Sequence, residues 1–149
     1  MHGNGVGGPG RCATSLLTRE EYMKSGSCLC GEVTCERDGK PEPAVACHCR
    51  RCRETSGHFW SATEIDRSRL RVTRDVGPRR YKSSGRARRG FCATRGSSLF
   101  REGFGNDRLA VAAGAIDGKT GLRSAEHIHV ADKGDYHETG DGLTRKDTM

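Results

Sequence analysis

The sequence predicts a small, mainly β fold built from short antiparallel strands. From Gly26 onward, short segments of alternating apolar and polar residues follow one another, separated by Gly, Pro and Asp-Gly turns. Hydrophobic residues make up only 33% of the 149-residue chain, and its 21 glycines add little to a core. A core this small benefits from added cross-links, and the eight cysteines are suited to supply them.

The strands are expected where the alternation of apolar and polar residues is clearest. The most regular segments cover residues 32–35, 70–73 and 127–130. Further strands are expected at residues 44–48, 60–65, 80–82, 98–101 and 109–113. The only helix-like piece in this part of the chain is 50–55, which is too short to contribute much to a core.

One domain is expected, covering residues 25–140. A flexible Gly-rich tail at 1–24, which contains Cys12, is expected before it, and a frayed segment at 141–149 after it. The N-terminus lacks the apolar stretch of a secretory signal, and the longest apolar runs, such as 109–113, are too short to cross a membrane. We therefore expect a cytoplasmic protein with no membrane partner.

The positive charge of the chain is concentrated in one region. The net charge is +7, and between Arg67 and Arg89 nine arginines and one lysine face a single acid, Asp75. Such a stretch indicates either an anionic partner, such as nucleic acid, or a solvated basic surface.

Two groups of cysteines have the spacing of metal ligands. Cys28 and Cys30 form one Cys-x-Cys pair, and Cys47 and Cys49 form another that continues as Cys-x-x-Cys to Cys52. Residues two apart in a strand point to the same face, so both sulfurs of a pair can converge on one ion. Their Cα atoms would lie about 6.6–6.8 Å apart, at the outer edge of the range for a disulfide. Zn²⁺ is the expected metal; the alternatives are buried inert thiols or a redox pair.

Four motifs in order along the chain carry a family resemblance. Residues 26–31 read Gly-Ser-Cys-Leu-Cys-Gly, and residues 47–52 read Cys-His-Cys-Arg-Arg-Cys, followed by Ser-Gly at 56–57. Residues 91–97 read Phe-Cys-Ala-Thr-Arg-Gly-Ser, and residues 114–117 read Gly-Ala-Ile-Asp. Over roughly residues 26–140 the chain resembles the glutathione-dependent formaldehyde-activating enzymes, which share their domain with centromere protein V.

The resemblance implies a small antiparallel β zinc-binding fold with zinc knuckles, of the Mss4-like type, and two zinc sites. It places Cys28, Cys30 and Cys92 at a structural zinc and Cys47, Cys49 and Cys52 at a catalytic one. The implied activity joins glutathione and formaldehyde to S-hydroxymethylglutathione, and the reverse reaction is that of a carbon–sulfur lyase. Glutathione, or a related small-molecule thiol, is the implied partner.

One departure from the family pattern affects the structural site. The family has a fourth cysteine where this chain has Arg95, and a guanidinium is a poor metal ligand because it does not lose its proton. Cys35, a histidine or water are possible replacements, although Cys35 reads better as an ordinary buried residue. Arg95 is alternatively a counter-charge for metal-free thiolates. One zinc is therefore firmly expected, and the second site is left open.

The central motif has the donor set of a catalytic site. Three cysteine ligands leave the fourth position of a tetrahedral zinc for a thiol, and three thiolates on Zn²⁺ carry a net charge of −1. Three cations flank the ligands: Arg50, Arg51 and Arg53. They are expected either to offset this charge or bind glutathione carboxylates, or to form an ordinary solvated surface. His48 is expected to pack on the opposite face of its strand, while Glu54, Ser56 and His58 are candidates for proton transfer.

A second class of function fits the same sequence. Zinc knuckles also occur in non-catalytic binding modules, and the basic stretch at 67–89 is able to follow phosphates. Tyr81 is its only aromatic residue, whereas platforms for single strands usually stack bases on several. The sequence therefore favours the enzyme and keeps a binding module for nucleic acid or protein as the alternative.

Overall fold

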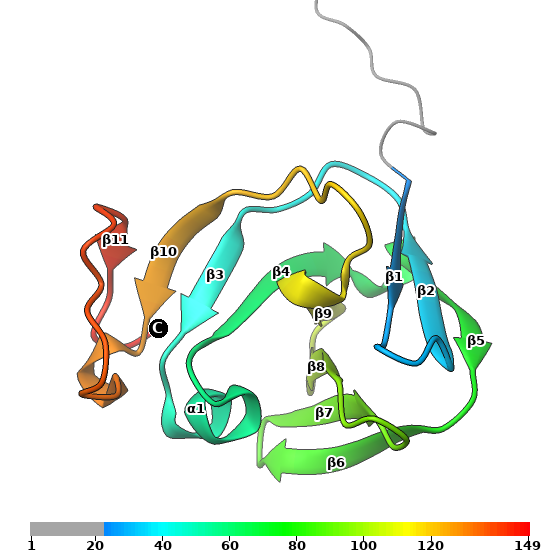
Figure 1. The fold of residues 1–149 in the computed structure, drawn as a ribbon, viewed down its shortest axis with the longest axis horizontal. Coiled ribbons are helices and arrows are strands. Elements are labelled where there is room, and N and C mark those ends of the chain that lie inside the picture. Colours follow the sequence, from blue (N-terminus) through cyan, green and yellow to red (C-terminus); the bar gives the residue numbers. More distant parts are fainter. Residues whose placement is uncertain (1–22) are drawn as a thin grey trace, which may run out of the picture.

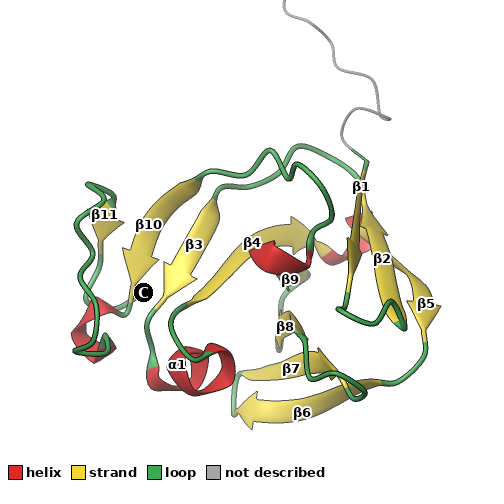
Figure 2. Cartoon of the chain, in the orientation of Figure 1, coloured by secondary structure: helices red, strands yellow, loops and turns green. Residues whose placement is uncertain are grey.

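The computed structural model describes residues 23–149, so nearly all of the expected tail, Cys12 included, lies outside the described residues. The described residues form one α-helix, three short 3-10 helices (Arg67–Arg69, Ala113–Ala115 and Val130–Asp132) and short strands (Figure 1), and the strands dominate the cartoon in Figure 2. The α-helix is α1 (Arg50–Ser56). The strands are β1 (Lys24–Ser27), β2 (Val33–Arg37), β3 (Ala44–Cys47), β4 (Trp60–Asp66), β5 (Leu70–Asp75), β6 (Pro78–Ser84), β7 (Ala87–Cys92), β8 (Ser98–Gly103), β9 (Arg108–Ala112), β10 (Ser124–Ile128) and β11 (Thr144–Arg145).

The strands form two sheets. The smaller has the order β1-β2-β5, and the larger has the order β11-β10-β3-β4-β9-β8-β7-β6. Most neighbours are antiparallel, as predicted, but β10 runs parallel to both β3 and β11. Figure 1 shows β10, β3 and β4 side by side at one end of the molecule and the small sheet at the other. No helix within residues 23–149 is long and apolar enough to cross a membrane.

Every segment predicted to be a strand overlaps one, and 50–55 overlaps α1. The prediction missed β1, β7 and β11. The strand expected at 127–130 begins earlier and ends at Ile128, because His129 adopts a left-handed conformation with φ 54°. Residues 141–149, where the sequence predicts a frayed segment, contain β11, and Lys146 N–H donates to the His127 carbonyl at 2.9 Å.

The larger sheet has a hydrophobic cluster on each face. Along β9, Leu109 and Val111 pack into one cluster while Ala110 and Ala112 pack into the other, as the period of a strand requires. The first cluster lies between the two sheets and includes Cys28 and Cys92. The second lies beneath α1 and is made of Cys52, Trp60, Ala62, Ala110 and Ala112. Alanines dominate it, so this face of the sheet has room above it.

Helix α1 ends where its sequence places a glycine. Gly57 has φ 81°, and its N–H donates to the Arg53 carbonyl at 2.8 Å, which closes the last turn. A residue with a Cβ is strained at this φ, so glycine suits the position. The helix buries Cys52 and exposes most of its other residues. Its role is therefore local, because it holds one cysteine at a fixed point beside β3.

Candidate functional site

Cys28, Cys30 and Cys92 form a sulfur cluster between the two sheets, named here the first triad. Their sulfur atoms lie within 4.8 Å of one another, with Cys28 Sγ 3.5 Å from Cys30 Sγ and Cys30 Sγ 3.6 Å from Cys92 Sγ. Cys28 and Cys92 are buried, whereas Cys30 is exposed. A tetrahedral zinc with Zn–S bonds of about 2.3 Å separates its ligands by about 3.8 Å, so these sulfurs have the right spacing for one ion.

The backbone helps to keep Cys28 ionised. Burial opposes ionisation, but the Val33 N–H, 3.2 Å from the sulfur, and the thiols of Cys30 and Cys92 outweigh it and lower the pKa of Cys28 to about 7. Cys35 lies outside the triad, and its burial raises its pKa to about 11. Cys35 is therefore an ordinary buried thiol, as the sequence suggested.

Arg95 lies in the turn that follows Cys92. Gly96 N–H donates to the Cys92 carbonyl at 2.7 Å, and Cys92 N–H donates to the Ser97 carbonyl at 2.9 Å. This turn exposes Arg95, and within residues 23–149 its side chain has no hydrogen bond or ion pair. The structure thus provides no fourth protein ligand at this position, and Arg95 makes no hydrogen bond to a sulfur of the triad.

Cys47, Cys49 and Cys52 form the second triad at the junction of β3 and α1. Cys47 ends the strand, Cys49 immediately precedes the helix, and Cys52 lies in its first turn. Strand parity brings Cys47 and Cys49 to one side, and the helical turn brings Cys52 back toward them. The three sulfur atoms lie within 4.8 Å of one another, a spacing that also fits one metal ion. Both triads are therefore able to hold a metal, consistent with zinc.

A buried arginine lies beside the second triad. Arg89 of β7 is only 4% exposed, donates from Nη2 to Cys52 Sγ at 3.1 Å, and lies over the Trp60 ring, 5.0 Å from its centroid. The hydrogen bond from the Cys47 thiol, followed by the charge of Arg89, outweighs burial and lowers the pKa of Cys52 to about 5. The same shared proton raises the pKa of Cys47. Arg89 thus supplies positive charge where three thiolates would gather.

The second triad opens into a cavity of about 660 Å³. All three cysteines line it, and its other walls come from the alanine-rich face of the sheet and from the C-terminal segment. This volume lies within the usual range of about 300–1,000 Å³ for small-molecule sites. Arginines of α1, of β7 and the turn before it, and of β8 also line the cavity, namely Arg51, Arg86, Arg89 and Arg101. The cysteines of the second triad therefore line a space that is large enough for a small thiol.

Three side chains linked in series by hydrogen bonds, those of His48, His127 and Asp141, lie beside the second triad. His48, fully buried between Cys47 and Cys49, places Nε2 2.8 Å from Nδ1 of His127, and His127 Nε2 lies 2.9 Å from Asp141 Oδ2. Burial lowers the pKa of His48 to about 4, so its ring is neutral at pH 7. With His127 donating to Asp141, its Nδ1 accepts the proton of His48 Nε2. His48 is thus a packed, hydrogen-bonded residue, as predicted.

The residues around α1 divide into two groups. Arg51 lines the cavity, whereas Arg50 pairs with Glu54 at 2.9 Å on the exposed face of the helix. Ser56 donates to the Cys52 carbonyl at 2.7 Å, and the His58 ring packs against Phe59 and His137. None of Glu54, Ser56 and His58 is among the described residues that line the cavity. They have structural contacts here rather than contacts with the reaction space.

Much of the basic stretch at 67–89 is neutralised by acids of the same chain. Five of its arginines form ion pairs, three of them with Glu102: Arg67, Arg69, Arg71, Arg80 and Arg88. Exposed cations that remain on β5 and β6 include Arg74, Arg79 and Lys82. The stretch thus offers fewer free cations for phosphates than its composition indicates.

Sequence reasoning missed the cavity and the side chains around it. Arg89 was one cation among ten in the basic stretch, and Arg101 and Asp141 were not singled out at all. His127 was noted only as part of an alternating segment. The one available signal was Arg89 itself, two residues before the Phe-Cys motif at 91–92. The other contacts depend on strand register and were not visible in the chain.

The comparisons agree with the resemblance. Residues 23–132 match the family model of the glutathione-dependent formaldehyde-activating enzymes. The crystal structure of a Rhodobacter sphaeroides protein, a structural genomics target, has a similar fold: 21% of residues are identical, 82% of this chain and 98% of that chain are covered, and the TM-score is 0.54. At this identity the likeness concerns the fold alone. The comparison with curated proteins gives no significant match.

Proposed function

Because the chain belongs to the glutathione-dependent formaldehyde-activating enzyme family, we propose that it catalyses the reversible addition of glutathione to formaldehyde. The product is S-hydroxymethylglutathione, and the reverse reaction is a carbon–sulfur lyase reaction. One observation supports this proposal most strongly: a triad of cysteines that is able to hold a metal ion opens into a cavity large enough for a small thiol.

The donor set of the second triad fits zinc in a catalytic role. Cys47, Cys49 and Cys52 supply three soft ligands, and all three line the cavity, from which a fourth ligand would come. Zinc bound there would hold an incoming thiol as its thiolate. Arg89 offsets the negative charge of such a centre, and the hydrogen bonds that link His48 to His127 and His127 to Asp141 fix the segment that carries Cys47 and Cys49.

The proposed reaction balances without a further reagent. The glutathione sulfur forms a bond to the formaldehyde carbon, and the carbonyl π bond breaks. The thiol proton ends on the new hydroxyl oxygen, and the reverse reaction returns it to sulfur. The tasks of this chain are to bind glutathione in the cavity, to place its sulfur beside the second triad and to keep Cys52 ionised through the Cys47 thiol and the charge of Arg89.

The Cys49→Ser variant tests the proposal. Loss of one thiolate should remove zinc from the second triad and reduce adduct formation to the uncatalysed rate, while the β fold persists. The rate is measured by NMR exchange between formaldehyde and its glutathione adduct, and zinc by elemental analysis. Cys35→Ala is the matched control, because Cys35 lies outside both triads, and it should keep zinc and activity. Undiminished turnover in Cys49→Ser would contradict the zinc-thiol mechanism.

A further inference from the structure

Two arginines lie directly opposite each other on the cavity face of the larger sheet. Arg89 of β7 pairs with Arg101 of β8, and Arg101 pairs in turn with Ala110 of β9. Paired residues of antiparallel strands share a face, with Cβ atoms about 4.5–5.5 Å apart, and like charges in this position are destabilising. All three residues line the cavity. The two guanidinium groups of Arg89 and Arg101 therefore repel each other at this wall of the cavity.

The opposite face of the same two strands is neutralised. Arg88 lies opposite Glu102, and the Arg88 Nε donates to Glu102 Oε2 at 2.5 Å. Arg67 and Arg80 lie 3.3 Å and 3.5 Å from the same carboxylate. On one face, the β7–β8 ladder thus places an acid among its cations. On the face that borders the cavity it places two cations, Arg89 and Arg101, with no acid opposite either of them.

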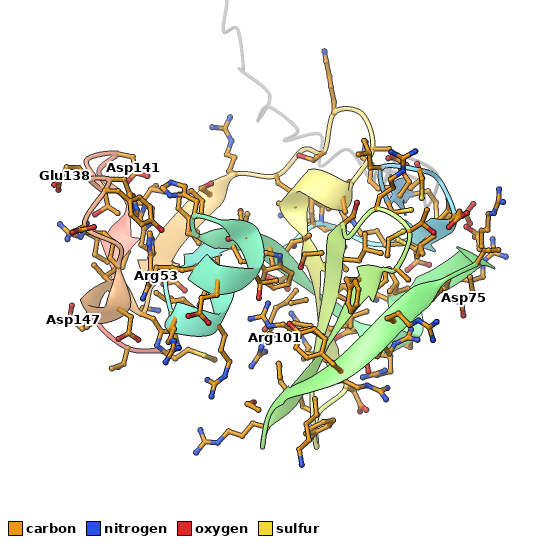
Figure 3. The ribbon with its side chains drawn as sticks, turned by 60° about the horizontal axis from the view of Figure 1, so that its bottom comes forward. Arg53, Asp75, Arg101, Glu138, Asp141 and Asp147 are labelled. Atoms are coloured by element: carbon orange, nitrogen blue, oxygen red, sulfur yellow. The ribbon has the colours of Figure 1, made fainter. Side chains whose placement is uncertain are left out.

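Only one of these two facing arginines has an anionic partner. Arg89 donates to the Cys52 sulfur, whereas the half-buried side chain of Arg101 has no hydrogen bond or ion pair with any residue of 23–149. The acids of the cavity are already engaged, since Glu42 and Glu64 pair with Arg108 and Glu126 pairs with Lys146. Figure 3, which labels Arg101, shows it between α1 and the strands of the β6–β7 hairpin.

We propose that Arg101 binds a carboxylate of the thiol substrate, so that the cavity selects thiols that carry an anion a few bonds from sulfur. The proposal rests on the proposed function, because it assigns a residue to the same cavity. Arg101 lies on the strand next to that of Arg89, with the two strands about 4.8 Å apart, and Arg89 contacts the second triad. A guanidinium binds a carboxylate through two parallel hydrogen bonds, which fixes the orientation of the ligand as well as its charge.

The test compares charged and neutral thiols in the zinc-loaded protein and in its Arg101→Gln variant. N-acetylcysteine and N-acetylcysteine amide differ in one carboxylate and little else. Arg101→Gln should raise the KM for N-acetylcysteine and for glutathione about tenfold, with kcat and the KM for the amide nearly unchanged. Arg79→Gln, a change of the same type on exposed β6 outside the cavity, should leave every parameter unchanged.

A binding measurement separates failure of this proposal from failure of the proposed function. S-methylglutathione keeps both carboxylates but has no thiol proton, and its Kd, measured by calorimetry, should rise about tenfold in Arg101→Gln. If the unmodified chain shows no catalysed exchange, the proposed function fails, and this Kd still decides on Arg101. Equal Kd values, or equal KM values for the acid in both proteins, would overturn the proposal. The thermal midpoint of Arg101→Gln should not fall, because the change relieves a repulsion, and a fall would indicate a structural role instead.

Discussion

At the residue scale, Arg95 stands where the family pattern has a fourth cysteine, so this motif gives the first triad no fourth thiolate for a metal ion. Arg95 lies three residues after Cys92, in the turn closed by Gly96, and points to solvent. We predict that the unmodified chain holds close to one tightly bound zinc, with a second equivalent removed by a mild chelator. Arg95→Cys should raise the stoichiometry toward two and increase the thermal midpoint by several degrees, because a metal that binds only the native state stabilises it.

Elemental analysis and chelator competition check the prediction, and Arg95→Ser is the control that removes the charge without adding a ligand. This control should stay near one zinc. Two chelator-resistant zinc ions in the unmodified chain would show that another group completes the first triad and that the argument from Arg95 is wrong.

Single residues also show what the sequence could and could not predict about the site. Five of the six cysteines were predictable because metal ligands need fixed local spacings, whereas Cys92 and the departure at Arg95 were visible only through the family resemblance. Arg89 and Arg101 were not predictable, because the pairing of β7 with β8 decides which arginines of a basic chain face a cavity. The same holds for Asp141, which reaches His127 from a segment that the sequence indicated would fray.

At the element scale, the β7–β8 ladder is held by a buried carboxylate. The Glu102 side chain is 8% exposed and pairs with three arginines. Burial opposes ionisation, but the hydrogen bond from Arg88 and the charge of Arg67 outweigh it and lower the pKa of Glu102. A carboxyl whose pKa is lower in the folded state adds stability above the pKa of the unfolded chain and loses it as the pH falls through the folded value.

Glu102→Gln should therefore destabilise the protein by about 1–3 kcal/mol at pH 7, since three cations lose their shared partner. The difference from the unmodified chain should shrink as the pH falls below about 4.3, where Glu102 begins to protonate in the unfolded chain. Urea unfolding at several pH values measures both effects. Glu54→Gln, which breaks only the exposed pair with Arg50, should change stability little, and a pH-independent loss in Glu102→Gln would refute the electrostatic explanation.

The elements themselves were largely predictable where one face of a strand is apolar. Strands such as β9 carry alternating residues that pack into two clusters, and this alternation is visible in the chain. The missed strands lack it: β1 reads Lys-Ser-Gly-Ser, β7 is rich in arginine and β11 has two residues. These three segments form strands because neighbouring strands of the fold pair with them, and not because of their own residue pattern. The parallel arrangement of β10 and β3 was likewise invisible, because it depends on the path of the chain between them.

At the scale of the whole molecule, each cysteine triad belongs to a different hydrophobic cluster. Cys28 and Cys92 are members of the cluster between the sheets, and Cys52 is a member of the cluster beneath α1. A metal ion at either triad would therefore cross-link a hydrophobic cluster that contains few large apolar side chains. The C-terminal segment joins this arrangement from outside, through Asp141 and β11 against β10.

Removal of residues 141–149 tests this link between the end of the chain and the second triad. The truncated chain loses the hydrogen bond from Asp141 to His127, the pairing of β11 and the bond from Lys146 N–H to the His127 carbonyl. His127 then no longer fixes His48, which lies between Cys47 and Cys49. Zinc affinity at the second triad should fall about 10–100-fold, as expected when groups that orient ligands are removed.

Chelator competition measures that affinity, and the thermal midpoint should fall by a few degrees as pairing is lost. Asp141→Asn keeps β11 and removes only the carboxylate, so it should lower zinc affinity less than the truncation and leave the thermal midpoint closer to that of the unmodified chain. Removal of residues 1–22 is the matched control, because the family match begins at residue 23, and we propose that this tail is dispensable. If the C-terminal truncation kept full zinc affinity, the hydrogen bonds from Asp141 to His127 and from His127 to His48 would have no part in holding the second triad.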